Sequence, residues 1–265
     1  MITLGAIVPH SPLLAPRVGK EKRDALRATL LAYQQLEEHL YARGIETIVI
    51  ISPHAQCYPD AFSGNMAERF TCTLKTFGDH ETSVEMPCDI LTLDRIQHVL
   101  RTHTDTPFTL TTSQELDYGF TIPLLFLSEY FKDLRIIPIS PSLLSATAHV
   151  DFGRALRPIL QESSKRIAII ASADLSHKLD PNSATGANVE GPAFDGTIRS
   201  KLKTMDIQGL LAMDPEAVEA AGQCGYLPIM MLLGVFDGVE TTQTELCYEA
   251  PFGVGSLTEL IEPVM

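Results

Sequence analysis

The chain has too few basic residues for a surface that binds nucleic acid or an anionic membrane. Its 20 Lys and Arg residues are outnumbered by 33 Asp and Glu residues, so the formal net charge is −13 and the isoelectric point is about 5.0. Proteins that bind a phosphate backbone or anionic lipids present clustered positive charge. The acidic balance therefore argues against both partners, although it selects no particular substrate.

Long apolar runs and paired cysteines are also missing. No apolar run reaches the length that crosses a bilayer, and the N-terminus lacks the cationic flank and long apolar core of a secretory signal. The five cysteines are scattered, and no two have the spacing of a zinc-binding pair. We therefore expect reduced thiols and a cytoplasmic location.

The composition is that of a globular α/β protein. With 265 residues, 45% hydrophobic and 20% charged, the chain can bury a substantial core. Short β-branched runs alternate with helical segments, which predicts a single α/β domain over residues 1–265 whose central sheet is mostly parallel or mixed and is flanked by helices. Strands are expected at 2–8, 46–51, 134–140, 240–249, 254–261 and in the run that begins at 166, and helices at 20–43, 89–102, 119–131, 148–163, 193–213 and 224–236.

Two of the expected strands have features of a sheet edge. Residues 70–74 alternate apolar and polar side chains, which suits an edge strand. Pro138 interrupts the strand at 134–140 and removes one ladder donor. We therefore expect this second strand to lie at an edge or to be locally irregular.

Three histidines follow apolar strands within a few positions. His10 follows the run 2–8, His54 follows 47–51, and His177 follows the run that begins at 166. Open α/β sheets build their sites beyond the carboxyl ends of such strands. One histidine in this position is more often a cap or a satisfied turn residue. Three in the same position favour a site at the C-terminal edge of the sheet.

His10 and His54 are the best candidates for metal ligands. Each follows a proline just past a strand, in Val8-Pro9-His10 and Ser52-Pro53-His54. The residue before each proline is held extended, which gives the turn a defined direction. The neutral imidazole of histidine is the commonest metal ligand among protein side chains, so the pair predicts a metal site.

His177 is interpreted as a general acid/base beside that metal, with a third ligand as the alternative. Asp174 either orients the second nitrogen of His177 or caps a turn. The other histidines are expected to be solvated, on helices or helix ends for His39, His98 and His103, and in polar loops for His80 and His149.

The third ligand has two candidates at the start of the helix near residue 224. Cys224 as a thiolate is a strong soft ligand, and a helix N-terminus lowers a thiol pKa. Gln223 is a weaker, neutral ligand. The alternative for Cys224 is simple burial. Glu249 precedes a glycine-rich turn and is a weaker candidate for a site residue. It either contacts a metal-binding residue without touching the metal or binds a backbone amide.

Several of these motifs resemble a known family. The chain is similar to the LigB-like class III extradiol dioxygenase superfamily, and within it to the Memo-like branch, the B component of the AmmeMemoRadiSam system. The resemblance runs from residue 1 to about 260. Its motifs are Pro-His-Ser-Pro-Leu-Leu at 9–14, Ser-Pro-His at 52–54, Ala-Asp-Leu-Ser-His at 173–177, Gln-Cys-Gly at 223–225 and Tyr-Glu-Ala-Pro-Phe-Gly-Val-Gly at 248–255.

The resemblance implies one α/β domain with its site at a sheet edge. In the ring-cleaving members two histidines and a glutamate hold Fe(II), a catechol binds through both oxygens together with O2, and another histidine moves protons. Carried over, His10 and His54 become the ligands and His177 becomes the acid/base. A facial arrangement of three ligands leaves open positions for the diol and O2.

The chain departs from the ring-cleaving pattern at two positions. Gln223 and then Cys224 stand where an acidic ligand is expected, and Memo-like members use a cysteine there. A thiolate ligand shifts the metal preference of the site toward Zn or Cu and away from Fe(II). Tyr118 stands where the family has a histidine that lines the substrate pocket, so we expect Tyr118 to bind substrate. We also expect Asp174 and Glu249 to be substrate-binding residues.

Three functions are consistent with these residues. The first is a non-haem extradiol dioxygenase that uses Fe(II) and O2 on a small aromatic diol. The second is a Memo-like metal-binding protein without ring cleavage that acts with a radical-SAM system. The third is a metal-dependent hydrolase with His177 as base. The protein partners considered are a further copy of the chain and a radical-SAM component.

Overall fold

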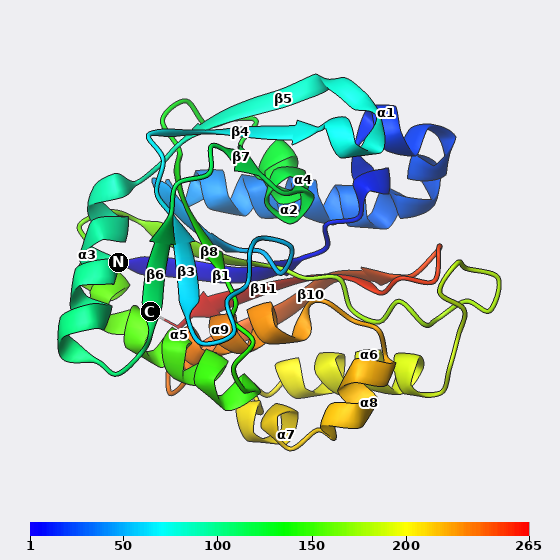
Figure 1. Cartoon of the computed structure of the whole chain (residues 1–265). Helices are drawn as coiled ribbons and strands as arrows, with labels where there is room; N and C mark the ends of the chain where they lie inside the picture. Colours follow the sequence, from blue (N-terminus) through cyan, green and yellow to red (C-terminus); the bar gives the residue numbers. More distant parts are fainter. Residues whose placement is uncertain (265) are drawn as a thin grey trace.

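The computed structural model describes residues 1–264 and contains two β-sheets. The large sheet has eight strands in the order β10-β11-β1-β9-β2-β8-β3-β6 (Figure 1). Strands β1, β9, β2 and β8 are parallel neighbours. β11 runs antiparallel to both β1 and β10, whereas β3 runs antiparallel to β8 and parallel to β6. The predicted mixed α/β sheet is confirmed. The strands are β1 (Ile2–Val8), β2 (Thr47–Ile51), β3 (Phe62–Asn65), β6 (Phe108–Thr111), β8 (Arg135–Ser140), β9 (Ile167–Ser172), β10 (Thr241–Glu249) and β11 (Ser256–Pro263).

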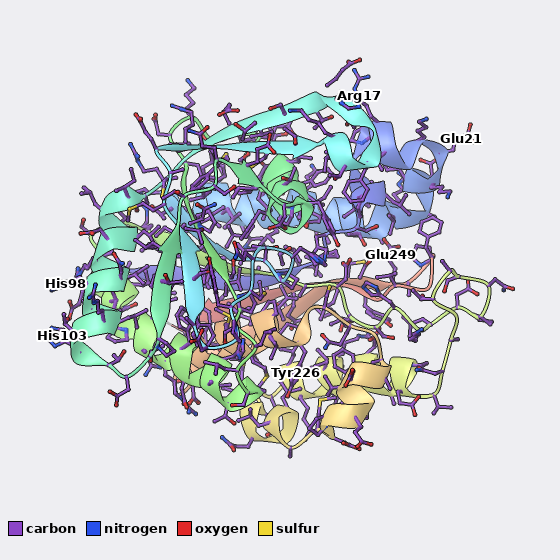
Figure 2. The ribbon with its side chains drawn as sticks, in the orientation of Figure 1. Arg17, Glu21, His98, His103, Tyr226 and Glu249 are labelled. Atoms are coloured by element: carbon purple, nitrogen blue, oxygen red, sulfur yellow. The ribbon has the colours of Figure 1, made fainter. Side chains whose placement is uncertain are left out.

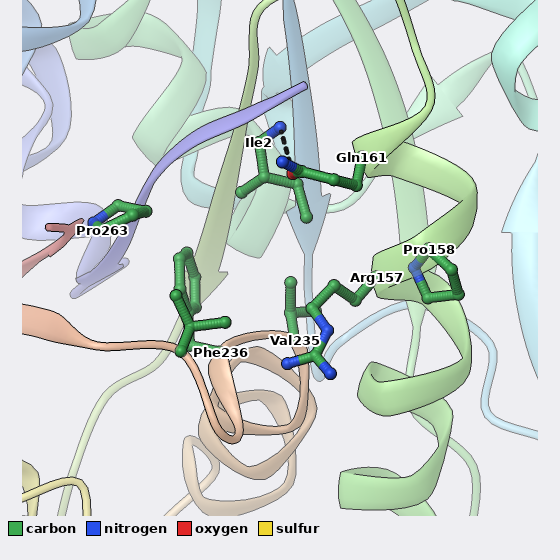
Figure 3. Close-up of a pocket in the computed structure, with 8 residues that line it drawn as sticks. Ile2, Arg157, Pro158, Gln161, Val235, Phe236 and Pro263 are labelled. Atoms are coloured by element: carbon green, nitrogen blue, oxygen red, sulfur yellow. Dashed lines mark hydrogen bonds between the residues drawn. The ribbon is translucent and has the colours of Figure 1, made fainter. Parts of the chain in front are cut away.

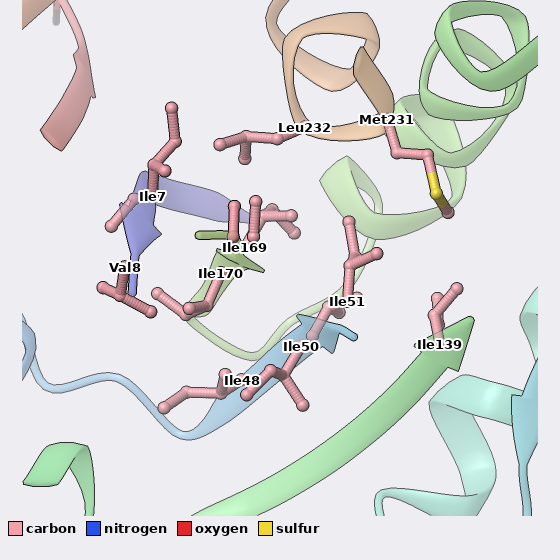
Figure 4. Packing of buried hydrophobic residues seen from close by; sticks show 14 of the residues in the cluster. Ile7, Val8, Ile48, Ile50, Ile51, Ile139, Ile169, Ile170, Met231 and Leu232 are labelled. Atoms are coloured by element: carbon pink, nitrogen blue, oxygen red, sulfur yellow. The ribbon is translucent and has the colours of Figure 1, made fainter. Parts of the chain in front are cut away.

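The inner strands form the hydrophobic core. Every residue of β2 and β9 is buried, because helices cover both faces of the sheet. Figure 4 shows Ile169 and Ile170 of β9 among the isoleucines of β2, with Met231 and Leu232 contributed by a helix. Burying each such side chain stabilises the fold by about 1.5–3 kcal/mol. This packing holds the carboxyl ends of the strands rigidly.

Helices lie on both sides of the large sheet (Figure 1). On one side α2 packs against α4, and on the other α5 packs against α9. The α5–α9 contact is close because it is made at glycines: a Cβ at Gly153 would lie 2.2 Å from the Met231 oxygen. The helices are α1 (Pro16–Gly19), α2 (Arg27–Ala42), α3 (Ile90–His103), α4 (Tyr118–Leu127), α5 (Ala146–Gln161), α6 (Glu190–Leu202), α7 (Ile207–Leu211), α8 (Pro215–Ala220) and α9 (Tyr226–Phe236), with 3-10 turns at Pro12–Leu14, Lys20–Leu26 and Lys75–Phe77.

The strand at residues 69–74 is central in a second sheet rather than at an edge. This sheet has the order β5-β4-β7, built from β5 (Asp79–Pro87), β4 (Arg69–Leu74) and β7 (Glu115–Leu116). The alternating pattern arises because Phe70, Cys72 and Leu74 point to the buried face of β4. Alternation reports one buried face, and a central strand of a small sheet shows it equally well.

Of the two alternatives for the strand that contains Pro138, an edge position or a local irregularity, the edge position was wrong. β8 lies between β2 and β3. The backbone amide of Arg135 donates a hydrogen bond to the Glu46 carbonyl oxygen, on the side of β8 that faces β2. Backbone amides along a strand point alternately to its two sides, so the Pro138 nitrogen points toward β3. β3 pairs only with Ile139 and Ser140, so the ladder has no position that needs an amide from Pro138.

Three smaller differences concern helices. The segment 20–43 begins as a 3-10 turn and becomes α-helical at Arg27. The segment 193–213 is two helices, since Asp206 caps the second by accepting from Gly209 N. His149 is buried in α5, where Nδ1 lies 2.8 Å from the Ser145 carbonyl oxygen, rather than solvated in a loop.

Two expected absences concern membranes and disulfides. Over the described residues, no helix is both long enough and apolar enough to traverse a lipid bilayer. All five cysteines are free thiols.

Candidate metal centre

His10 and His54 meet at the carboxyl edge of the large sheet. They follow β1 and β2, which are separated by β9 alone. Their Nε2 atoms are 2.9 Å apart, and their rings are almost perpendicular, at 86°. Two strand ends far apart in sequence thus bring two imidazole nitrogens within the span of one small cation.

Cys224 completes a group of three donors. Its Sγ lies 3.3 Å from His10 Nε2, and one donor atom from each of His10, His54 and Cys224 lies within 4.8 Å of the others. Gln223 is turned elsewhere, because its Oε1 accepts from Tyr226 N at 2.7 Å at the start of α9. Of the two candidates for a third ligand, only the thiol faces the histidine pair.

A hydrogen-bond chain determines which His10 nitrogen is free. The Ser172 hydroxyl donates to the Gly119 carbonyl oxygen and lies 2.8 Å from His10 Nδ1. A serine hydroxyl has one hydrogen, and a carbonyl can only accept it. His10 Nδ1 must therefore donate to Ser172, which leaves an unprotonated Nε2 facing His54 and Cys224.

Burial keeps both histidines neutral near pH 7. It lowers the pKa of His10 to about 3, with a smaller effect of His177, and lowers the pKa of His54 to about 4, with a smaller effect of His10. Two nitrogens 2.9 Å apart repel unless a proton or a cation lies between their lone pairs. The pair is therefore suited to binding a cation and poorly suited to carrying charge itself.

The Cys224 thiol does not have the lowered pKa expected at a helix start. Burial raises its pKa, and the nearby Asp174 carboxylate adds to the rise. Cys224 precedes the α9 N-cap Gly225, so the field of the helix is outweighed by desolvation. The thiol is protonated at neutral pH, and a bound metal must displace its proton.

Asp174 and His177 form the other side of the cluster. Asp174 Oδ1 accepts from the backbone amide of His10 at 3.0 Å, so this carboxylate positions His10 rather than a ring nitrogen of His177. Asp174, His177 and Cys224 also have donor atoms within 4.8 Å of one another. His177 Nε2 is buried without a hydrogen-bond partner among residues 1–264. An unpartnered buried nitrogen is available to a ligand or a proton.

Tyr118 covers His54. The two rings stack at 4.4 Å, and the Tyr118 hydroxyl lies 2.8 Å from His54 Nε2. Burial raises the pKa of Tyr118, with smaller effects of Cys224 and Asp174, so the residue stays a neutral phenol. It can donate to a ligand at the site but cannot take the part of an imidazole.

Glu249 lies outside this cluster, at the end of β10 (Figure 2). Its Oε1 accepts from Thr29 N at 2.8 Å and Thr29 Oγ1 at 2.6 Å. Glu249 therefore binds a backbone amide, one of the two roles expected for it, and holds the first turn of α2 through Thr29. His98 and His103 lie on α3 (Figure 2). Neither belongs to the groups of possible metal donors found among the described residues.

Sequence reasoning missed three supporting residues. Ser172 orients His10, Asp117 accepts from Ser52 Oγ at 2.8 Å next to His54, and Asp195 accepts from Ser176 N at 2.8 Å next to His177. Ser172 is the last residue of β9, and in the sequence it is a polar residue directly after an apolar run. This signal could have identified it. Asp195 lies on α6, distant in sequence from the residue that it supports.

An apolar pocket of about 310 Å³ lies elsewhere, where Ile2 begins β1 (Figure 3). Phe236, Val235 and Pro263 line it, with Arg157 as its charged residue. It shares no residue with the histidine and cysteine cluster. The candidate site is thus defined by side-chain chemistry at the opposite ends of the strands.

The fold and this cluster agree with comparisons to known proteins. A family described as the catalytic LigB subunit of aromatic ring-opening dioxygenase matches residues 4–258, and the chain belongs to this LigB family. Protein CA_C1420 of Clostridium acetobutylicum is 28% identical over 258 residues, which are 94% of this chain and 55% of that protein. This chain thus spans little more than half of that relative.

Other relatives carry the name of the Memo-like branch. A MEMO1 family protein of Methanococcoides burtonii is 24% identical over 92% of this chain and 77% of its own length. The crystal structure of uncharacterized protein JW3007 from Escherichia coli K12 shares the fold, with a TM-score of 0.70, 18% identity and coverage of 98% and 99% of the two chains. The predicted resemblance to the LigB-like superfamily and its Memo-like branch is confirmed.

Proposed function

We propose that this LigB-family chain binds one metal ion through His10, His54 and Cys224 and is an extradiol dioxygenase for a catecholic substrate. The observation that carries the proposal is the position of the His10 ring: its Nδ1 lies 2.8 Å from Ser172 Oγ, and its Nε2 lies 2.9 Å from His54 Nε2 and 3.3 Å from Cys224 Sγ. A ligand histidine in proteins is usually oriented in this way through its other nitrogen. Membership of the LigB family supports the choice of reaction.

The donor set fits a mononuclear transition metal. Two imidazole nitrogens and a thiolate suit Fe, Zn or Cu, whereas Mg and Ca prefer oxygen ligands. Fe(II) is the metal proposed for the oxygenase, with Zn or Cu as alternatives. When bound, the metal would supply Lewis acidity toward the diol oxygens and the redox chemistry that O2 requires.

The protein residues have separate tasks in this reaction. The His177 Nε2, which has no partner within residues 1–264, takes a proton from the substrate hydroxyl and returns it to the product. Tyr118 donates a hydrogen bond beside His54. Both atoms of O2 enter the product: the ring C–C bond next to the diol breaks, and an aldehyde and a carboxylic acid form. No external reductant is needed.

Anaerobic metal loading tests the proposal. Protein purified without O2 is loaded with Fe(II), and O2 uptake is recorded with a panel of small catechols. The proposal expects diol-dependent uptake at one O2 for each ring-opened product, and His177→Ala should abolish uptake while retaining iron. Stoichiometric iron without diol-dependent uptake would contradict the dioxygenase.

One observation favours a second function. The Cys224 thiol stands where a ring-cleaving site has a carboxylate, and a soft donor favours Zn or Cu over Fe(II) oxygenase chemistry. The second proposal is therefore a Memo-like metal-binding protein without ring cleavage that acts with a radical-SAM component. Tight binding of Zn(II) or Cu(I), with no O2 uptake under any loading, would support it.

A further inference from the structure

The apolar pocket beside the amino end of β1 has the size of a small-molecule site. Its volume of about 310 Å³ lies at the lower end of the range for ligand pockets in proteins. The apolar part of its lining comes from Ile2 at the start of β1, Pro263 at the end of β11, and Val235, Phe236 and Val239 in or just after α9 (Figure 3). A pocket with this lining suits an apolar group of limited size.

The charged side chain of this pocket is Arg157, and its charge is unpaired. Figure 3 shows Arg157 reaching from α5 toward Val235 and Phe236. Its Nη1 donates to the carbonyl oxygen of Asp237, the C-cap residue of α9. The Asp237 carboxylate pairs instead with Arg154, whose Nη2 lies 2.6 Å from Oδ2. Arg157 forms no ion pair with any residue in 1–264.

Gln161 adds a second hydrogen-bond donor to the lining. Its Oε1 accepts from Ile2 N at 3.1 Å, which identifies the other side-chain atom as the amide nitrogen Nε2. Within the described residues, Nε2 donates to no other group. Gln161 is exposed and Arg157 is half-buried, so both residues are accessible to a ligand from solvent.

The free polar side-chain groups of the pocket are therefore donors. A guanidinium has five N–H groups, of which the bond to Asp237 uses one. No acidic side chain occurs among the described residues that line the pocket. The net charge of −13 opposes the approach of an anion, but charges beyond about 8 Å are largely screened at physiological ionic strength. The local charge of Arg157 therefore decides which head group is preferred.

We propose that this pocket binds a small carboxylate with an apolar tail, the carboxylate on Arg157 and the tail against the apolar lining. The planar guanidinium matches a carboxylate through two parallel hydrogen bonds. The alternative is that Arg157 serves only to hold the end of α9, which uses one N–H group and leaves the charge without a counter-ion. The pocket shares no residue with the candidate metal centre, so the inference does not rest on the proposed function.

Calorimetry with the full chain tests the choice of head group. Octanoate, 1-octanol and octylammonium share one tail and differ in the charge of the head group. Octanoate should bind at one site and about threefold or more tightly than 1-octanol, and octylammonium should bind most weakly. Equal affinities, the reverse order, or no binding of octanoate would overturn the inference.

A matched pair of variants assigns the preference to Arg157. Arg157→Gln retains an N–H group for the Asp237 carbonyl and removes the charge, so octanoate and 1-octanol should bind with equal affinity. Arg154→Gln is the control, because Arg154 lies one turn earlier on α5 and does not line the pocket. It should leave the preference unchanged. A preference that persists in Arg157→Gln would overturn the assignment.

Two further measurements locate the ligand. Val239→Phe fills part of the pocket and should weaken the binding of both octanoate and 1-octanol, whereas unchanged binding would place the tail elsewhere and overturn the inference. A carboxylate can also bind a metal ion, so octanoate is titrated into metal-free and Zn(II)-loaded protein. The two affinities should be equal, and binding that requires Zn(II) would place the carboxylate at the metal centre and contradict the proposal.

Discussion

His10 Nδ1 donates a hydrogen bond of 2.8 Å to Ser172 Oγ across two adjacent parallel strands. Ser172 ends β9 and pairs with Val8, the last residue of β1, so the sheet itself fixes the distance. The Ser172 hydroxyl in turn donates to the Gly119 carbonyl oxygen at the start of α4. The orientation of the His10 ring is therefore determined by two strands and a helix rather than by a loop.

The first prediction follows from this bond. Ser172→Ala should lower Zn(II) affinity by about 10–100-fold, because His10 loses the group that fixes its tautomer and ring orientation. Affinity is measured by competition with a chelating dye. Ser140→Ala is a matched control: Ser140 ends β8 and is buried, and its hydroxyl has no hydrogen bond in the described structure. Equal affinities for the two variants would contradict the role of Ser172.

The pH dependence of metal binding should reflect a single proton. Burial holds the pKa of His10 at about 3 and that of His54 at about 4, so neither imidazole loses a proton on binding metal between pH 6 and 8. Burial raises the pKa of the Cys224 thiol, which therefore must release one. The affinity for Zn(II) should rise about tenfold per pH unit over this range. Cys224→Ser should flatten the slope, and a slope near two in the unmodified protein would contradict the assignment.

A buried carboxyl group predicts a gain in stability. Burial, with a smaller effect of Glu245, raises the pKa of Glu259 in β11 from 4.5 to about 7. The folded state thus favours the protonated group, whose contribution is complete below pH 4.5 and is lost as the pH rises through 7. Glu259→Gln should stabilise the protein by roughly 1–3 kcal/mol at pH 8 and leave it unchanged at pH 4.

Chemical denaturation at the two pH values measures this difference. Glu240→Gln, an exposed acidic position, is the control and should change stability at neither pH. Stabilisation of Glu259→Gln by the same amount at pH 4 would show that the effect does not come from titration.

Asp195 should determine the placement of His177. Its Oδ1 accepts from Ser176 N at 2.8 Å, and its Oδ2 accepts from the Tyr248 hydroxyl at 2.7 Å. Asp195→Ala leaves the buried amide of Ser176 unpaired and should cost about 1–3 kcal/mol of unfolding free energy. It should also change the chemical shifts of the His177 ring in NMR spectra. Tyr248→Phe removes only the second bond and should move those shifts much less.

Much of this site could be predicted from the sequence. His10 and His54 follow β-branched strands, and the geometry of parallel sheets brings such positions together. The choice between Gln223 and Cys224 could not be made in this way, because adjacent residues at a helix start differ only in the direction of their side chains. The structure separates them through the hydrogen bond that Tyr226 N donates to Gln223 Oε1.

The failed predictions have a common cause. Pro138 and the alternating residues 70–74 indicated sheet edges, but the neighbours of a strand are set by tertiary packing. β3 pairs only with the end of β8, which accommodates Pro138, and β7 covers the far side of β4. His149 was likewise expected in a polar loop, whereas α5 begins at Ala146 and buries it.

The metal content of four variants, measured after loading and gel filtration, is the most direct test of the centre formed by His10, His54 and Cys224. His10→Ala and His54→Ala should lose the metal, Cys224→Ser should bind it more weakly, and His177→Ala should retain one equivalent. Loss of the metal from His177→Ala together with its retention by Cys224→Ser would contradict the ligand set and place the ion beside Asp174 and His177 instead.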